Sequence, residues 1–83
     1  MDERSCYRLT VGNYEIRPDP EPVDMGDEEV FGDAVVITWY GRRTAQKTIL
    51  AARKYFYNEL HAREEAMDRG LAYVYTRDPD LKI

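Results

Sequence analysis

The densest group of chemically active side chains in the sequence is a row of carboxylates between residues 18 and 33. Pro18, Pro20 and Pro22 alternate with acids in its first half, and no lysine or arginine interrupts it. Proline lacks an N–H and disfavours helix in the preceding residue, so we expect an exposed, partly stiffened acidic loop. Such a loop resembles a phosphate backbone electrostatically and could dock on a basic partner surface. The alternative is a loop that only keeps the protein soluble. The acids concerned are Asp19, Glu21, Asp24, Asp27, Glu28 and Glu29.

The same acids do not form a recognisable metal site. Gly26 stands at the wrong position for a calcium-binding loop, and the third position of such a loop carries no acid. The sequence also contains no CxxC, no HExxH and no glycine-rich phosphate loop. A pairing of Cys6 with His61 is not expected, because His61 is predicted to lie on the side of a helix that faces away from the sheet. We therefore expect no enzyme, no metal and no cofactor.

Length and composition fit one domain spanning residues 1–83. The chain is 43% hydrophobic and 34% charged, which is typical of a folding sequence. The segment from Pro18 to Glu29 contains six carboxylates and no cation, so it is more negative than the whole chain, whose net charge is −4. The rest of the chain is therefore mildly basic. The single cysteine, the charged first residues and the lack of an apolar run of about 20 residues favour a cytoplasmic protein.

Two segments are predicted to be strands before the middle of the chain. Residues 5–17 alternate in polarity, as in a half-buried strand, and Gly12-Asn13 interrupts them. This dipeptide could form a two-residue hairpin turn or a bulge in one long strand, and we slightly favour the hairpin. Residues 33–40 are rich in β-branched and aromatic side chains and predict a central strand.

A long helix is predicted over residues 44–69. Thr44 is a suitable N-cap, and Gly70 is a suitable left-handed C-terminal stop. The apolar stripe that supports this helix consists of Ala45, Ile49, Ala52, Phe56, Leu60 and Met67. Residues 71–77 then alternate as a last strand. The expected fold is α+β, with a small antiparallel or mixed sheet of three to four strands and one long helix packed on one face.

Two further surfaces depend on that helix. Its outer face would form a seam for a protein partner or a homodimer, unless the helix is buried on more than one side. This outer face comprises Lys47, Leu50, Lys54, Tyr57 and His61. At the helix start, Arg42, Arg43 and Lys47 would place three cations beside a helix N-terminus, where a phosphate or an acidic partner could bind.

The segment Trp39-Tyr40-Gly41-Arg42-Arg43, followed by Lys47-Thr48-Ile49 and by Phe56 and Glu59-Leu60, resembles the arm-type DNA-binding domain of tyrosine recombinases. The resemblance covers about 25 residues. It implies a three-stranded sheet that precedes one helix and places basic strand residues in the major groove. The acidic segment, the negative net charge and the predicted strand after the helix depart from that pattern.

The size, the acidity and the carboxylates from Asp19 to Glu29 also resemble phage-encoded inhibitors of the anti-CRISPR type. That resemblance implies a target in the host cytoplasm, either a CRISPR effector surface or its DNA-binding groove. From the sequence we expect a non-enzymatic binding protein that acts through the acidic loop and the outer helix face. The alternatives are a nucleic-acid-binding module that uses the basic residues, and a self-associating structural protein.

Overall fold

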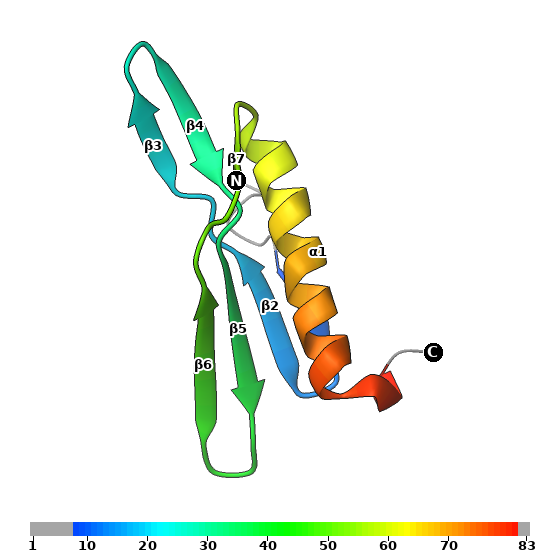
Figure 1. The fold of residues 1–83 in the computed structure, drawn as a ribbon. Helices are drawn as coiled ribbons and strands as arrows, with labels where there is room; N and C mark the ends of the chain where they lie inside the picture. Colours follow the sequence, from blue (N-terminus) through cyan, green and yellow to red (C-terminus); the bar gives the residue numbers. More distant parts are fainter. Residues whose placement is uncertain (1–7, 82–83) are drawn as a thin grey trace, which may run out of the picture.

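The computed structural model describes residues 8–81, which form two antiparallel sheets and one long helix (Figure 1). The larger sheet has the order β1 (Leu9–Val11), β2 (Tyr14–Pro18), β5 (Val35–Tyr40), β6 (Ala45–Leu50). The smaller has the order β3 (Pro22–Met25), β4 (Glu28–Gly32), β7 (Tyr55–Phe56). Helix α1 (Glu59–Arg77) and a 3-10 turn, η2 (Pro79–Leu81), complete the chain. This arrangement confirms the α+β class.

The helix packs on one face of the larger sheet, and the core lies between them. Ile16, Val35 and Ile37 point from β2 and β5 toward α1, which contributes Ala66 and Val74. All five side chains are buried. None of the helices among residues 8–81 is long and apolar enough to cross a membrane.

Gly12 and Asn13 form a two-residue hairpin turn, which confirms the favoured prediction. The residues on either side, Val11 and Tyr14, face each other in the β1–β2 ladder. Gly12 has a φ of +58°, a conformation that glycine adopts without a steric penalty. The predicted strand over residues 33–40 is also present, as β5.

The acidic segment is not a loop, contrary to the prediction. Residues 22–32 form the β3–β4 hairpin, whose tight turn contains Gly26 at a φ of +72°. The prolines do not prevent this strand, because Pro22 stands at the first position of β3, where a sheet tolerates a missing N–H. Val23 and Val30 supply one apolar cross-strand pair that stabilises the hairpin.

The helix predicted over residues 44–69 was placed too early. Residues 45–50 form β6 and pair along their whole length with β5. The apolar spacing that indicated a helix is misleading here, because Ile49 is 67% exposed and pairing with β5 decides the conformation. The real N-cap is Asn58, whose side chain accepts hydrogen bonds from the N–H groups of Leu60 at 2.8 Å and His61 at 3.3 Å.

The end of the helix also differs from the prediction. Residues 71–77 belong to α1 and form no strand, and Gly70 lies inside the helix without a positive φ. The absence of a Cβ at Gly70 serves packing instead, because a Cβ there would lie 2.3 Å from Cγ2 of Ile16. Tyr73 and Tyr75, whose alternation predicted a strand, pack against the core on either side of the buried Val74.

Candidate functional site

Charge is segregated into two hairpins that project from opposite ends of the molecule (Figure 1). The described residues extend 46 Å along the longest axis. The acidic β3–β4 hairpin lies at one end and the turn between β5 and β6 at the other. Residues 18–33 contain no Lys or Arg, and residues 34–58 contain no Asp or Glu. The cations of the second segment are Arg42, Arg43, Lys47, Arg53 and Lys54.

The β5–β6 hairpin is closed by a tight turn that exposes two arginines. The Gly41 N–H donates to the Thr44 carbonyl at 2.8 Å, which leaves Arg42 and Arg43 at the tip. Neither arginine forms an ion pair with another residue in the range 8–81. A second bond, from the Tyr40 N–H to the Asn13 carbonyl at 2.8 Å, ties this hairpin to the β1–β2 turn. The tip is therefore held by one bond within the hairpin and by one bond from the neighbouring β1–β2 turn.

The face of the larger sheet that points away from α1 carries further cations. Directly paired residues share a face, so Glu15, Thr38 and Lys47 lie together on the side opposite Ile37. Arg17 and Tyr40 complete a shallow depression of about 280 Å³ on this face. The one carboxylate there, Glu15, lies 3.5 Å from Arg8 and is thereby partly neutralised. We call Arg42, Arg43, Lys47 and Arg17 the basic surface.

The β3–β4 hairpin brings carboxylates directly opposite one another. Asp24 pairs with Glu29, and both side chains are exposed. Like charges in directly opposed positions of an antiparallel ladder are destabilising. Asp27 and Glu28 lie at the turn, and Met25 beside them is 62% exposed. We call Asp24, Asp27, Glu28 and Glu29 the acidic tip.

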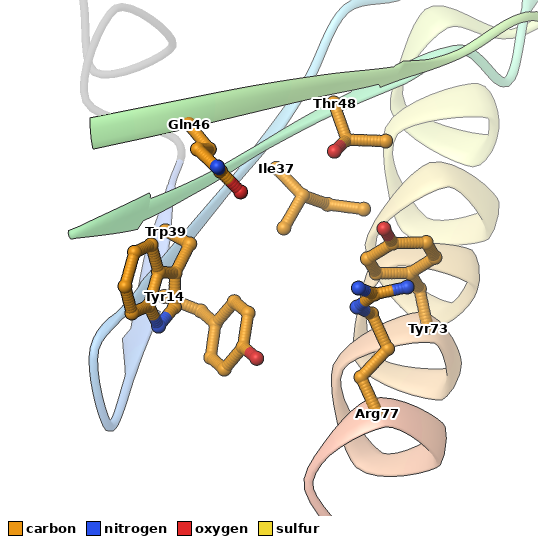
Figure 2. A pocket seen from close by; sticks show the side chains of 7 residues that line it. All are labelled: Tyr14, Ile37, Trp39, Gln46, Thr48, Tyr73 and Arg77. Carbon is orange, nitrogen blue, oxygen red and sulfur yellow. The ribbon is translucent and has the colours of Figure 1, made fainter. Parts of the chain in front are cut away.

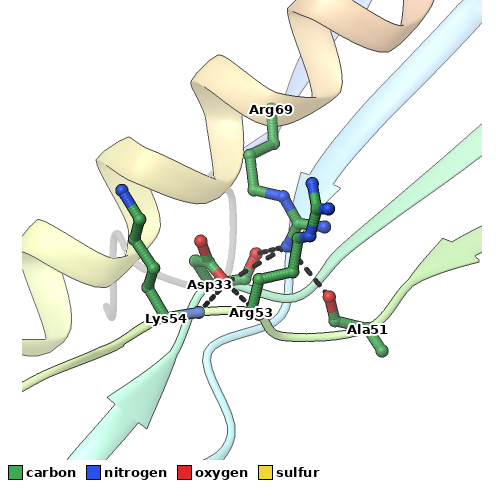
Figure 3. A network of polar contacts seen from close by, with 5 residues as sticks. All are labelled: Asp33, Ala51, Arg53, Lys54 and Arg69. Atoms are coloured by element: carbon green, nitrogen blue, oxygen red, sulfur yellow. Dashed lines mark hydrogen bonds and ion pairs between the residues drawn. The ribbon is translucent and has the colours of Figure 1, made fainter.

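Asp33 and Arg69 form a buried polar node between the two sheets and the helix (Figure 3). The Asp33 carboxylate accepts bonds from the N–H groups of Arg53 at 2.8 Å and Lys54 at 3.2 Å. The Arg69 guanidinium lies 3.1 Å from that carboxylate and also donates to the carbonyls of Asp33 and Ala51. The node fixes the irregular segment 51–54 that follows β6.

The node also sets the ionisation of Asp33. Desolvation by burial alone would raise the pKa of its carboxyl group. The two backbone N–H donors and the Arg69 charge favour the carboxylate and outweigh that effect, so the pKa of Asp33 lies below its ordinary value. Asp33 is therefore a structural anion and not a proton donor near neutral pH.

The predicted helix seam does not exist, because its members lie on different elements. Lys47 and Leu50 belong to β6, Lys54 follows it, Tyr57 precedes the N-cap, and His61 lies in the first turn of α1. The predicted anion site at a helix start is also wrong in its geometry, since no helix begins at residue 44. Arg42, Arg43 and Lys47 do lie on one hairpin, however, the two arginines in its turn and Lys47 in β6.

His61, the partner considered for Cys6 in the sequence, lies in the first turn of α1. His61 lies 3.7 Å from Glu65 and packs against Phe56, with ring centroids 4.4 Å apart. Cys6 lies outside the described residues. Among residues 8–81 no three metal-ligating side chains come together.

A cavity missed by the sequence analysis opens between the larger sheet and the C-terminal half of α1 (Figure 2). It has a volume of about 280 Å³, and Ile37 lies at its base. Tyr14 and Trp39 line one side, and Tyr73 and Arg77 the other, with the Arg77 guanidinium carbon 5.3 Å from the centre of the Tyr73 ring. The high tyrosine content was a signal for such a surface, but it did not give the location.

Comparison of the chain with protein-family models, with curated proteins and with solved structures finds no match. The features of the molecule that bear on function are therefore the geometry and charge of its two hairpins.

Proposed function

We propose that this protein is a non-enzymatic nucleic-acid-binding module that places the β5–β6 hairpin against the phosphate backbone. The observation that carries the proposal is the charge segregation, because the charged residues of the segment 34–58 are all cations and two of them, Arg42 and Arg43, are exposed at the tip of the β5–β6 hairpin. A two-stranded ribbon has the width that the major groove of duplex DNA accepts. Arginine also matches phosphate geometry with its planar fork of donors.

The negative net charge does not oppose this proposal once the fold is considered. The β3–β4 hairpin carries four carboxylates and no cation, so its charge alone equals the net charge of −4, and it lies at the far end of a molecule 46 Å long. Screening in physiological salt acts over about 8 Å, so the acidic tip has little effect on a phosphate near Arg42. The resemblance to the arm-type DNA-binding domain implies a three-stranded sheet before one helix, whereas in residues 8–81 the larger sheet before α1 has four strands.

Neutralising the hairpin tip is expected to weaken binding to a duplex DNA by about tenfold or more. The variant Arg42→Gln/Arg43→Gln loses two phosphate contacts and the counterion release that accompanies them. Fluorescence anisotropy with a labelled duplex at about 50 mM salt measures the effect, and a single strand of the same sequence tests the preference for duplex.

The matched control is Arg53→Gln/Arg77→Gln, which changes the net charge equally but at exposed positions away from the tip. We expect its affinity to fall less than threefold. Equal losses in the two double variants would show that only net charge matters and would reject the hairpin as the binding element.

A second candidate function is docking of the acidic tip on a basic protein surface. The observation that favours it is the direct opposition of Asp24 and Glu29, an arrangement that weakens the hairpin. Such a partner would normally hold nucleic acid, as the resemblance to inhibitors of the anti-CRISPR type implies, and would be met in the host cytoplasm. The exposed Met25, which shares a face with its paired residue Glu28, adds an apolar contact to this hairpin.

The variant Glu29→Thr is expected to stabilise the protein by about 0.5 kcal/mol, because it removes the repulsion and adds a strand-favouring residue. Chemical denaturation measures this gain. Glu21→Thr is the control, since Glu21 lies outside the ladder and should change stability little. A loss of stability in Glu29→Thr would contradict the assigned strand register.

A further inference from the structure

The outer edge of β6 is the longest strand edge left without a partner among residues 8–81. β6 lies at the margin of the larger sheet and has six residues. The other margin, β1, has three residues, and the free edge of β3 begins at Pro22, which lacks an N–H. Free edges of this length can accept a strand from another chain.

The hydrogen-bond alternation of the hairpin identifies the backbone groups that are available. The Gly41 N–H donates to Thr44, so this pair is a hydrogen-bonded one. In an antiparallel ladder such pairs alternate with non-bonded ones, so Gln46, Thr48 and Leu50 bond toward β5. The N–H and C=O groups of Ala45, Lys47 and Ile49 therefore point to the open edge.

A groove lies beside this edge, between the end of β6 and the helix. It has a volume of about 760 Å³. Leu50 and Ala51 line it on the strand side, and Ala72, Tyr73 and Thr76 line it on the helix side. Tyr73 and Arg77 also line the aromatic cavity of Figure 2, so the two hollows adjoin. A strand added to β6 would direct alternate side chains into this groove.

All charged side chains that line the groove are cationic, namely Arg53, Arg69 and Arg77. Arg69 is neutralised by Asp33 at 3.1 Å. Arg53 and Arg77 have no carboxylate within ion-pair distance in the described part of the chain. Two uncompensated cations at a groove favour an anionic occupant.

We propose that an extended acidic segment of a partner protein adds to β6 as a fifth strand of the larger sheet and inserts alternate side chains into the groove beside α1. Backbone pairing along β6 provides affinity, and the groove selects the side chains. A second copy of this chain is a poorer occupant, because its own acidic strand β3 has the free edge blunted by Pro22. This surface is distinct from Arg42 and Arg43, so the two proposals can fail separately.

The test uses a synthetic peptide that alternates Glu and Val, with a twin in which Lys replaces every Glu. Trp39 is the sole tryptophan and lines the adjoining cavity, so its fluorescence reports binding. We expect the acidic peptide to bind with a Kd below 1 mM and the Lys twin at least tenfold more weakly. Hydrogen exchange should show new protection at the amides of Lys47 and Ile49.

The variant Ile49→Pro removes one outward N–H while leaving the bonds toward β5, and it should weaken the acidic peptide at least tenfold. Ile49→Thr keeps that N–H and should change affinity less than threefold. Arg77→Glu reverses the charge of an exposed side chain and removes its contact with the Tyr73 ring, and it is expected to weaken binding about tenfold. Any one of three results would overturn the proposal. The acidic peptide could fail to bind at about 1 mM, or its affinity could be unchanged in both Ile49→Pro and Arg77→Glu. The third is concentration-dependent dimerisation of the protein that Ile49→Pro abolishes.

Discussion

Replacing Asp33 by alanine is expected to lower the free energy of unfolding by about 3 kcal/mol. The substitution leaves the N–H groups of Arg53 and Lys54 without their acceptor and removes the charge that faces Arg69. Asp33 is only 2% exposed, so water does not readily replace the carboxylate. A domain of this size has a total stability of roughly 5–10 kcal/mol, so the loss is a large share of it. Urea denaturation monitored by circular dichroism measures the change.

Asp33→Asn is the matched variant, because its side-chain oxygen can still accept from the two N–H groups. Its expected cost is about half that of the alanine variant, and the difference separates hydrogen bonding from charge. Equal stability of wild type and both variants would show that the node does not hold segment 51–54.

The same carboxylate makes stability depend on pH at the acid end. The pKa of Asp33 is lower in the folded protein than its ordinary value of 3.8, so the folded state favours the ionised form. The stabilisation of the folded state by the Asp33 carboxylate is fully present above about pH 4, and it is lost as the pH falls through the lowered pKa of Asp33 in the folded protein. The contribution is absent in Asp33→Asn. A plot of unfolding free energy against pH should therefore fall less steeply below about pH 4 in that variant.

Gly70→Ala is expected to destabilise the protein by about 2 kcal/mol, although alanine is the better helix former by about 1 kcal/mol. The added Cβ would lie 2.3 Å from Cγ2 of Ile16 and 3.2 Å from Cγ2 of Val35. Both neighbours are fully buried, so the helix must move away from the sheet to relieve the overlap. Chemical denaturation measures the effect, and a more stable Gly70→Ala would contradict the helix–sheet packing.

A double-mutant cycle with Ile16→Leu tests the cause. Leucine has no branch at Cβ and so removes the methyl group that meets the new atom, while keeping the volume of the side chain. We expect the double variant to be more stable than the sum of the single effects predicts, by about 1 kcal/mol. If the stability effects of the two single substitutions simply add, the overlap with Ile16 is not the cause of the destabilisation by Gly70→Ala.

The sequence predicts the parts of the fold whose conformation is set by neighbours along the chain. The β-branched run that becomes β5 and the Gly12-Asn13 turn follow from local preference, and both are present. The conformation of residues 45–50 depends instead on pairing with β5, which a helical apolar spacing does not reveal. A local signal for the true helix existed in Asn58 and the small-residue stripe that follows it at intervals of four. The buried members of that stripe are Ala62, Ala66, Gly70 and Val74.

Only a part of the candidate site could be predicted from the sequence. The clustering of Arg42, Arg43 and Lys47 could be predicted from their closeness in the sequence, although they lie on a hairpin and not at a helix start. The distance between the acidic and basic segments could not be predicted from the sequence, because it depends on where the two hairpins project from the folded sheets. The groove beside β6 joins residues more than 20 positions apart and depends on helix packing. No periodicity along the chain indicates it.

The most direct test of the central claim is the salt dependence of duplex DNA affinity for the wild type and for Arg42→Gln/Arg43→Gln. If the basic surface contacts about three phosphates, the logarithm of the association constant should fall with the logarithm of salt concentration with a slope of about −3 in the wild type. The double variant should show a slope of about −1, while Arg53→Gln/Arg77→Gln keeps the wild-type slope. No measurable duplex binding by the folded wild type at about 50 mM salt, or equal slopes in the wild type and Arg42→Gln/Arg43→Gln, would contradict the assignment of nucleic-acid binding to the β5–β6 hairpin.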